Sequence, residues 1–267
     1  MNRLLFFIAI LLISFNSTGQ FQGPLQFRTG MQVHDLQDYG HSPLLYSGTG
    51  LYLGITNKNF KKNGFCGFEF SHSFSTLSPK KIEFNSLSPN LVKHKEFDLN
   101  WTYLNRIFKK NEKLGIHFGG IVNLEADYSV YNSIGNNPIA YDASISIKPS
   151  LKLNFLDLFL DVDVPLISYT LRPKSKGFVP TDNGDVNLLS VLENGRVQTL
   201  NNYFYIHANF GVYFRQIKLV KSIQFFYDFK GGMNKSSSYR GFTQHTIGLK
   251  FWFNNTKFIT IKCQPEE

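Results

Sequence analysis

Polar and apolar residues alternate strictly along much of this chain. In the clearest run, 203–214, Phe204 and Phe210 fall on one face while His207 and Asn209 fall on the other. A period of two puts successive side chains on opposite faces of a β-strand. The pattern therefore predicts an all-β protein of about ten strands, within a range of 8–12. The other predicted strands are 26–34, 44–56, 65–76, 92–104, 113–126, 141–153, 156–167, 219–231 and 240–253.

The predicted connections alternate between short and long. Antiparallel β-barrels of bacterial outer membranes have short turns at the periplasmic end and longer loops outside. An even strand number then places both chain ends in the periplasm. The longest connection, 168–198, exceeds what a simple link needs, and such loops are usually functional or disordered. We therefore expect a transmembrane β-barrel whose loop 168–198 contacts any extracellular ligand.

A soluble alternative shares this alternation. Secreted β-sandwiches and lipocalin-like barrels also alternate, with their apolar residues inside, and would bind an apolar ligand. Bulky aromatic residues on nearly every apolar face and charges of both signs opposite them favour the membrane. A further feature resembles the aromatic girdle of a membrane interface, namely tyrosines and tryptophans near the predicted strand ends. These residues are Tyr46, Tyr103, Tyr128, Tyr141, Tyr203 and Trp252.

The N-terminus has the layout of a secretory signal. It combines a positively charged start, an apolar run over 4–13 and small residues at Ser17 and Gly19. The apolar run is shorter than the roughly 20 residues that a spanning helix needs. We expect a signal peptide over 1–19, cleaved after Gly19, and a barrel over 20–253 in the outer membrane.

The stretch 246–253, Thr-Ile-Gly-Leu-Lys-Phe-Trp-Phe, has a glycine and two aromatic residues at set spacing. It resembles the closing-strand signal that barrel-assembly machinery reads in bacterial outer-membrane proteins. The resemblance implies that Gly248, Phe251 and Phe253 form an assembly signal and that this machinery is a partner. Residues 254–267 follow where that signal usually ends the chain, as a periplasmic tail or an extra strand. The richness in Phe and Asn resembles outer-membrane proteins of the Bacteroidota, with no specific family identified.

The formal charge of +9, from 28 Lys and Arg against 19 Asp and Glu, does not require a polyanionic partner. Basic residues gather in the predicted short turns, where they can contact anionic lipid headgroups, so outer-membrane lipid is an expected partner and nucleic acid is not.

Other charges fall on the predicted lumen face. A barrel of about ten strands is narrow, so these charges form either a selective pore or a paired network that fills it. They are Arg28, Glu69, Glu125, Lys148, Lys152, Asp161, Asp163, Asp228 and Lys250.

Candidate chemistry is sparse. His94, Glu96 and Asp98 share one predicted inward face and are weak candidates for an acid–base site. His34, His117 and His207 also point inward, but their spacing gives no compact ligand motif, so neither a metal nor a cofactor is expected. His72 falls on the outward face.

The leading interpretation is a non-enzymatic barrel, namely a small pore, a structural protein or a surface-binding scaffold. The enzymatic alternative acts on lipid or peptide.

Cys66 and Cys263 are the only cysteines. The predicted topology places both at the periplasmic end, where disulfides form. A bridge between them would hold the C-terminal tail beneath the barrel, and two thiols are the alternative.

Overall fold

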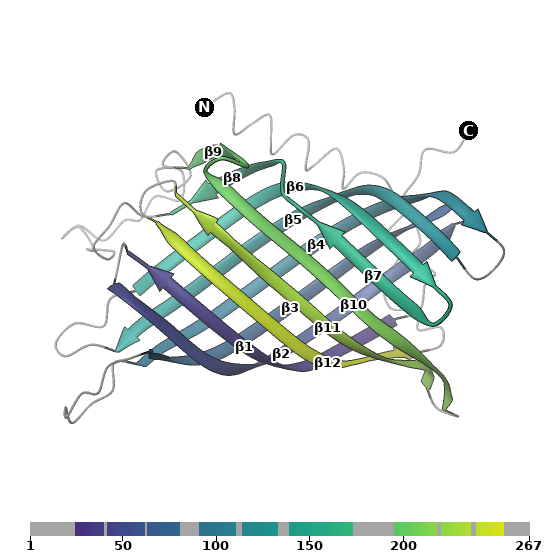
Figure 1. Cartoon of the computed structure of the whole chain (residues 1–267), viewed down its shortest axis with the longest axis horizontal. Helices are drawn as coiled ribbons and strands as arrows, with labels where there is room; N and C mark the ends of the chain where they lie inside the picture. Colours follow the sequence, from purple (N-terminus) through teal and green to yellow (C-terminus); the bar gives the residue numbers. More distant parts are fainter. Residues whose placement is uncertain are drawn as a thin grey trace, which may run out of the picture.

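The chain folds into a closed antiparallel β-barrel (Figure 1). The computed structural model describes residues 25–39, 42–61, 63–80, 91–110, 114–132, 139–172, 195–217, 220–235 and 239–253. Strand β1 pairs with both β2 and β12, which closes the sheet on itself. The strands are β1 (Leu25–Asp38), β2 (Ser42–Lys61), β3 (Gly64–Pro79), β4 (Leu91–Lys110), β5 (Leu114–Asn132), β6 (Ile139–Phe155), β7 (Leu158–Asp163), β8 (Ile167–Leu171), β9 (Arg196–Thr199), β10 (Tyr203–Ile217), β11 (Val220–Asn234) and β12 (Arg240–Phe253).

Two of the wall strands are interrupted. β7 and β8 both pair with β6, and an irregularity at 164–166 separates them. β9 pairs with β8, and β10 pairs with β7, across a turn at 200–202. Each interrupted pair therefore occupies one position in the wall. The described residues form a barrel of ten strand positions, which confirms the predicted fold class.

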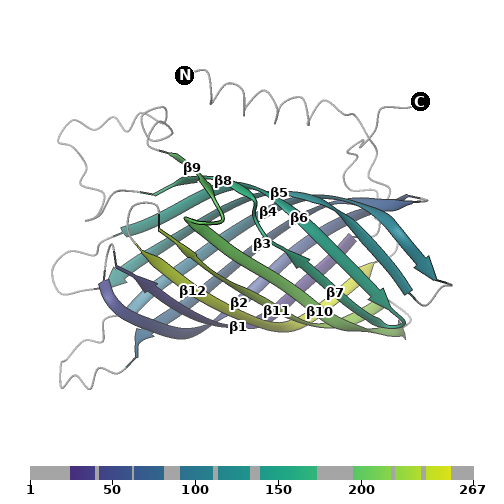
Figure 2. The same ribbon diagram turned by 45° about the horizontal axis from the view of Figure 1, so that its top comes forward.

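The two ends of the barrel differ in the lengths of the connections between their strands. Figure 2 shows the wall from a second side. At one end, which we call the short-turn end, the connections span 62–63, 111–113, 156–157 and 218–219. At the other, the long-loop end, they span 39–41, 80–90, 133–138, 172–195 and 235–239. β1 begins and β12 ends at the short-turn end. The predicted signal peptide 1–19 and tail 254–267 lie outside the described residues.

Several strands are longer than predicted. β4 continues through 105–110, part of a predicted turn, and β5 continues to Asn132, inside a predicted loop. The prediction that 168–198 is all loop is wrong at both ends, because β8 and β9 occupy 167–171 and 196–199. Local alternation is weak there, and pairing with neighbouring strands stabilises these segments.

The side chains divide by face. Large apolar residues point outward and are exposed, as at Met31 (68%) and Ile247 (51%), whereas Arg28 is only 4% exposed inside. No helix among the described residues is long and apolar enough to cross a bilayer.

Part of the predicted aromatic girdle is wrong. Tyr46, Tyr203 and Trp252 are buried. They follow the inward parity of their strands, which the prediction from position alone ignored. Tyr103 and Tyr128 are exposed on the outer surface, as a girdle requires.

Gly248 of the predicted assembly signal lies where β12 meets β1. It is opposite Gly30 in the register. A Cβ at Gly248 would lie 2.2 Å from the carbonyl oxygen of Thr29 and 2.8 Å from the ring of Phe226. Only glycine permits this close approach, so Gly248 has a packing role in the closing strand.

Candidate functional site

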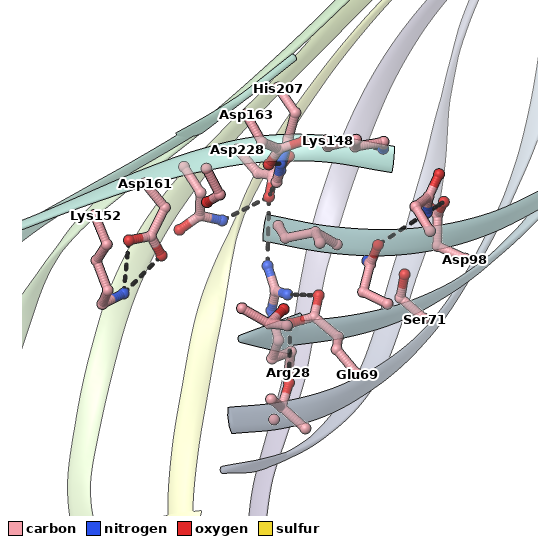
Figure 3. A pocket seen from close by; sticks show the side chains of 18 of the residues that line it. Arg28, Glu69, Ser71, Asp98, Lys148, Lys152, Asp161, Asp163, His207 and Asp228 are labelled. Carbon is pink, nitrogen blue, oxygen red and sulfur yellow. Dashed lines mark hydrogen bonds and ion pairs between the residues drawn. The ribbon is translucent and has the colours of Figure 1, made fainter. Parts of the chain in front are cut away.

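A charged cavity of about 100 Å³ lies inside the barrel (Figure 3). Side chains from opposite walls converge on it, including most of the residues predicted to face the lumen. Glu125 is also buried inside, beyond this cavity. The predicted lumen residues that line the cavity are Arg28, Glu69, Lys148, Lys152, Asp161, Asp163, Asp228 and Lys250.

Asp228 is the centre of one network in this cavity. Arg28 of β1 donates to Glu69 of β3 and, at 3.3 Å, to Asp228 of β11. His207 contacts Asp163 through Nδ1 at 2.6 Å and Asp228 through Nε2 at 3.0 Å. A ring with carboxylates at both nitrogens is held best as the doubly protonated imidazolium. The network thus links β1, β3, β7, β10 and β11 across the lumen.

Lys230 is the centre of a second network. Its ammonium group donates to Glu96 and Asp98, and lies 3.1 Å from Glu125. Carboxylate oxygens of the three acids lie within 4.8 Å of one another, which is a spacing that could hold a metal ion. Lys230 supplies the positive charge there. The cluster therefore has its counter-ion from the chain itself.

The proposed acid–base set is not assembled as a unit. His94 contacts Ser129 Oγ through Nδ1 at 2.8 Å and packs edge-on against His34 at 4.5 Å between ring centroids. Glu96 and Asp98 bond to Lys230 instead. All of these side chains point inward, as predicted, but His94 and the two acids have different partners.

The remaining histidines lie apart from this set. His117 faces inward near the short-turn end, against Phe65. His72 lies on the outer face, stacked on Phe97 at 4.3 Å between ring centroids, with Nδ1 2.9 Å from the Glu96 carbonyl oxygen. His72 therefore packs as an aromatic ring on the outer wall.

Two apolar clusters lie inside the barrel. Towards the long-loop end, a buried cluster joins residues from six strands; it consists of Leu36, Tyr46, Leu77, Val92, Tyr131 and Ala140. Tyr52, Phe159 and Phe226 form a second cluster beside the charged cavity, whose wall includes Tyr52.

Sequence reasoning missed several lumen charges. Arg240 donates to Asp127 at 2.6 Å and to Asp142 at 3.3 Å, and Arg172 donates to Asp38. Arg240 continues the inward alternation of its predicted strand, so the signal was present. Arg172 was missed because it lay in a predicted loop.

Cys66 is buried beside Phe65 near the short-turn end, and Cys263 lies outside the described residues. We expect a Cys66–Cys263 disulfide in protein isolated from an oxidising compartment. Peptide mapping without reductant should recover the linked peptides, and prior reduction is the control. Recovery of both cysteines as thiols from natively folded protein would contradict the bridge.

Comparisons with known proteins find solved structures of similar fold but no family. No family model matches the chain, and no curated protein matches it. Among solved structures, the outer membrane protease OmpT from Escherichia coli matches with a TM-score of 0.41 and 12% identity, over 90% of this chain and 100% of that one. The β domain of the Bordetella autotransporter BrkA matches at 0.39 and 11%, over 87% and 100%. The translocator domain of the autotransporter NalP from Neisseria meningitidis matches at 0.37 and 12%, over 91% and 92%. At these scores the matches carry no argument about activity.

Proposed function

We propose that this chain is an integral outer-membrane β-barrel that acts as a non-enzymatic scaffold with a closed lumen. The observation that carries the proposal is the inversion of polarity between its faces. Phe118 and Phe210 are exposed on the outer wall, whereas Lys148 and Lys230 are buried within. A soluble barrel that binds an apolar ligand needs the opposite arrangement. Lipid is the solvent in which such an outer surface is stable.

The state of the lumen favours a scaffold over a pore. Porins with an aqueous channel have 16 or more strands, whereas barrels near eight strands are filled by side chains. Here the charged cavity measures about 100 Å³. Ion pairs such as Lys230–Asp98 join opposite walls across it. The longer loops at the other end would then present the binding surface, with 172–195 the longest, and barrel-assembly machinery would insert the chain.

An enzymatic role has weaker support. His94 is buried beneath the apolar cluster of the long-loop end, and the carboxylates of Glu96 and Asp98 are ion-paired with Lys230. A catalytic site on lipid or peptide needs substrate access to such groups.

Membrane fractionation and conductance test the proposal together. The chain should stay in the membrane pellet after carbonate or urea washing, because its outer surface is solvated by lipid. A peripheral protein from the same membranes is the wash control. Purified barrel in planar bilayers should give no porin-sized current steps, with a known porin as positive control. Release by washing would contradict the membrane barrel, and stable current steps would contradict the closed lumen.

A further inference from the structure

Two lysines at the short-turn end of the lumen lack an acidic partner. Lys250 is 6% exposed and donates to the amide oxygen of Asn209 at 2.8 Å. Within the part of the chain that the structure describes, neither Lys250 nor Lys58 has a carboxylate oxygen within 4.0 Å. Other buried lumen cations do have one; they are Arg28, Lys148, Lys152, Arg172, Lys230 and Arg240. Burying an ammonium group without an opposite charge is unfavourable.

Aromatic rings hold these lysines beside two further cations. Each ring is shared by two positive groups, and ring faces attract cations. The Phe65 ring centroid lies 5.4 Å from Lys58 Nζ and 5.9 Å from Lys152 Nζ. The Phe159 centroid lies 5.3 Å from Lys152 Nζ and 4.5 Å from Lys250 Nζ. The Phe226 centroid lies 4.8 Å from Lys250 Nζ and 5.1 Å from Arg28 Cζ. Four cations are thereby fixed around one space.

Their side chains line the charged cavity. Arg28, Lys58, Lys152 and Lys250 all contribute to its wall, and Figure 3 shows Arg28 and Lys152 converging on it. Glu69 and Asp228 pair with Arg28, and Asp161 pairs with Lys152. These carboxylates thus form their ion pairs with other cations and act on Lys250 and Lys58 only from beyond ion-pair distance.

Buried donors without acceptors lie in the same registers. Gln224 and Arg28 are the cross-strand neighbours of Lys250 on either side. Arg28 Nε and Gln224 Nε2 are buried with no hydrogen-bond partner, and so is Trp252 Nε1. An anion has only acceptor sites, so it matches the two ammonium groups and Arg28 Nε, the one of these three donors whose residue lines the cavity.

We propose that this end of the lumen binds one small tetrahedral oxyanion, of the class of inorganic phosphate or sulfate, through Lys250 and Lys58. A cavity of about 100 Å³ suits an ion of this size. The ion would be the missing counter-charge of the cage formed by Lys58, Lys152, Lys250 and Arg28. The site faces the end at which the chain leaves β12, so a carboxylate of the acidic tail, at Glu266 or Glu267, is the competing occupant.

Calorimetric titration of inorganic phosphate into the full-length, detergent-folded barrel tests the site at constant ionic strength. We expect saturable binding of one phosphate per barrel. Lys250→Met and Lys58→Met should each weaken it at least tenfold. Lys80→Met removes an equal charge from a half-exposed pair with Asp35 at the far end and should leave binding unchanged. If Lys250→Met fails to fold, Lys58→Met carries the comparison.

A second readout is local. The indole of Trp252 lies 6.0 Å from Lys58 Nζ, so phosphate should change tryptophan emission in wild type and in Trp101→Phe. If phosphate does not bind saturably, or binds both lysine variants as tightly as wild type, the site is overturned. Binding that appears only after Glu266→Gln and Glu267→Gln identifies the tail as the occupant and also overturns a free anion. Membrane retention and conductance are unaffected by these outcomes, so the scaffold proposal is tested separately.

Discussion

Replacing Lys230 by methionine is expected to lower the free energy of unfolding by about 3–5 kcal/mol, the usual cost of breaking a buried ion pair. Lys230 is 5% exposed and is the shared partner of Glu96, Asp98 and Glu125. Methionine keeps the length of the side chain but leaves three carboxylates together in the lumen. Urea unfolding in detergent or lipid vesicles measures the loss.

Lys80→Met is the matched control. Lys80 pairs with Asp35 at 2.9 Å, but the lysine side chain is 44% exposed. Exposed pairs contribute about 0–1 kcal/mol. Equal losses in the two variants would contradict a structural role for the lumen network.

Metal ions provide an independent check on the same variant. In wild type the carboxylate oxygens lie within 4.8 Å of one another, and Lys230→Met removes their ammonium partner. Hard divalent cations prefer carboxylate oxygens. Calcium should therefore raise the stability of Lys230→Met and leave wild type unchanged. An additional Glu96→Gln exchange should recover part of the stability and reduce the calcium effect.

The wall of this barrel was predictable because alternation is a local signal. A period of two assigns each residue to a face without knowledge of its neighbours across the sheet. This is why Arg28, Asp161 and Lys250 could be placed inward from sequence. Predictions of which face a side chain occupies were wrong where parity was not used, as for Tyr46, or where the strand is irregular.

The contacts inside the barrel were not predictable because they depend on closure. Arg28 and Asp228 lie 200 residues apart in sequence, and Lys230 and Glu96 lie 134 apart. Their contact depends on barrel register, strand tilt and the order of strands around the wall. No local pattern of a single sequence carries that information.

An irregular strand explains the missed Arg172. The alternation of β7 slips by one residue at 164–166, so that Leu166 and Ile167 are both exposed and Ser168 is buried. A β-bulge of this kind reverses the inward parity beyond it. The inward face therefore continues through Thr170 to Arg172, in a segment whose polar residues resemble a loop.

The second large effect is expected when arginine is introduced into the outer wall at the depth of the bilayer core. Ile247 lies midway along β12 and is 51% exposed on the outer face. If that face contacts hydrocarbon, Ile247→Arg should lower the free energy of unfolding in phospholipid vesicles by about 2–4 kcal/mol. Gln37, near the long-loop end of β1, lies where the bilayer interface is expected. Gln37→Arg should cost only about 0–1 kcal/mol.

Comparing Ile247→Arg with Gln37→Arg distinguishes lipid from water around the barrel, because the same side chain is introduced at two depths. On a soluble barrel both positions would be hydrated, and each arginine would change stability by about 0.5 kcal/mol or less. Denaturant unfolding of the two variants in vesicles therefore gives a large difference only for a membrane barrel. Repeating the measurement in detergent, which adapts around a charge more easily than a bilayer, should shrink the penalty at Ile247 and leave Gln37 unchanged. Equal small costs in vesicles would mean that water, not lipid, surrounds the exposed apolar wall.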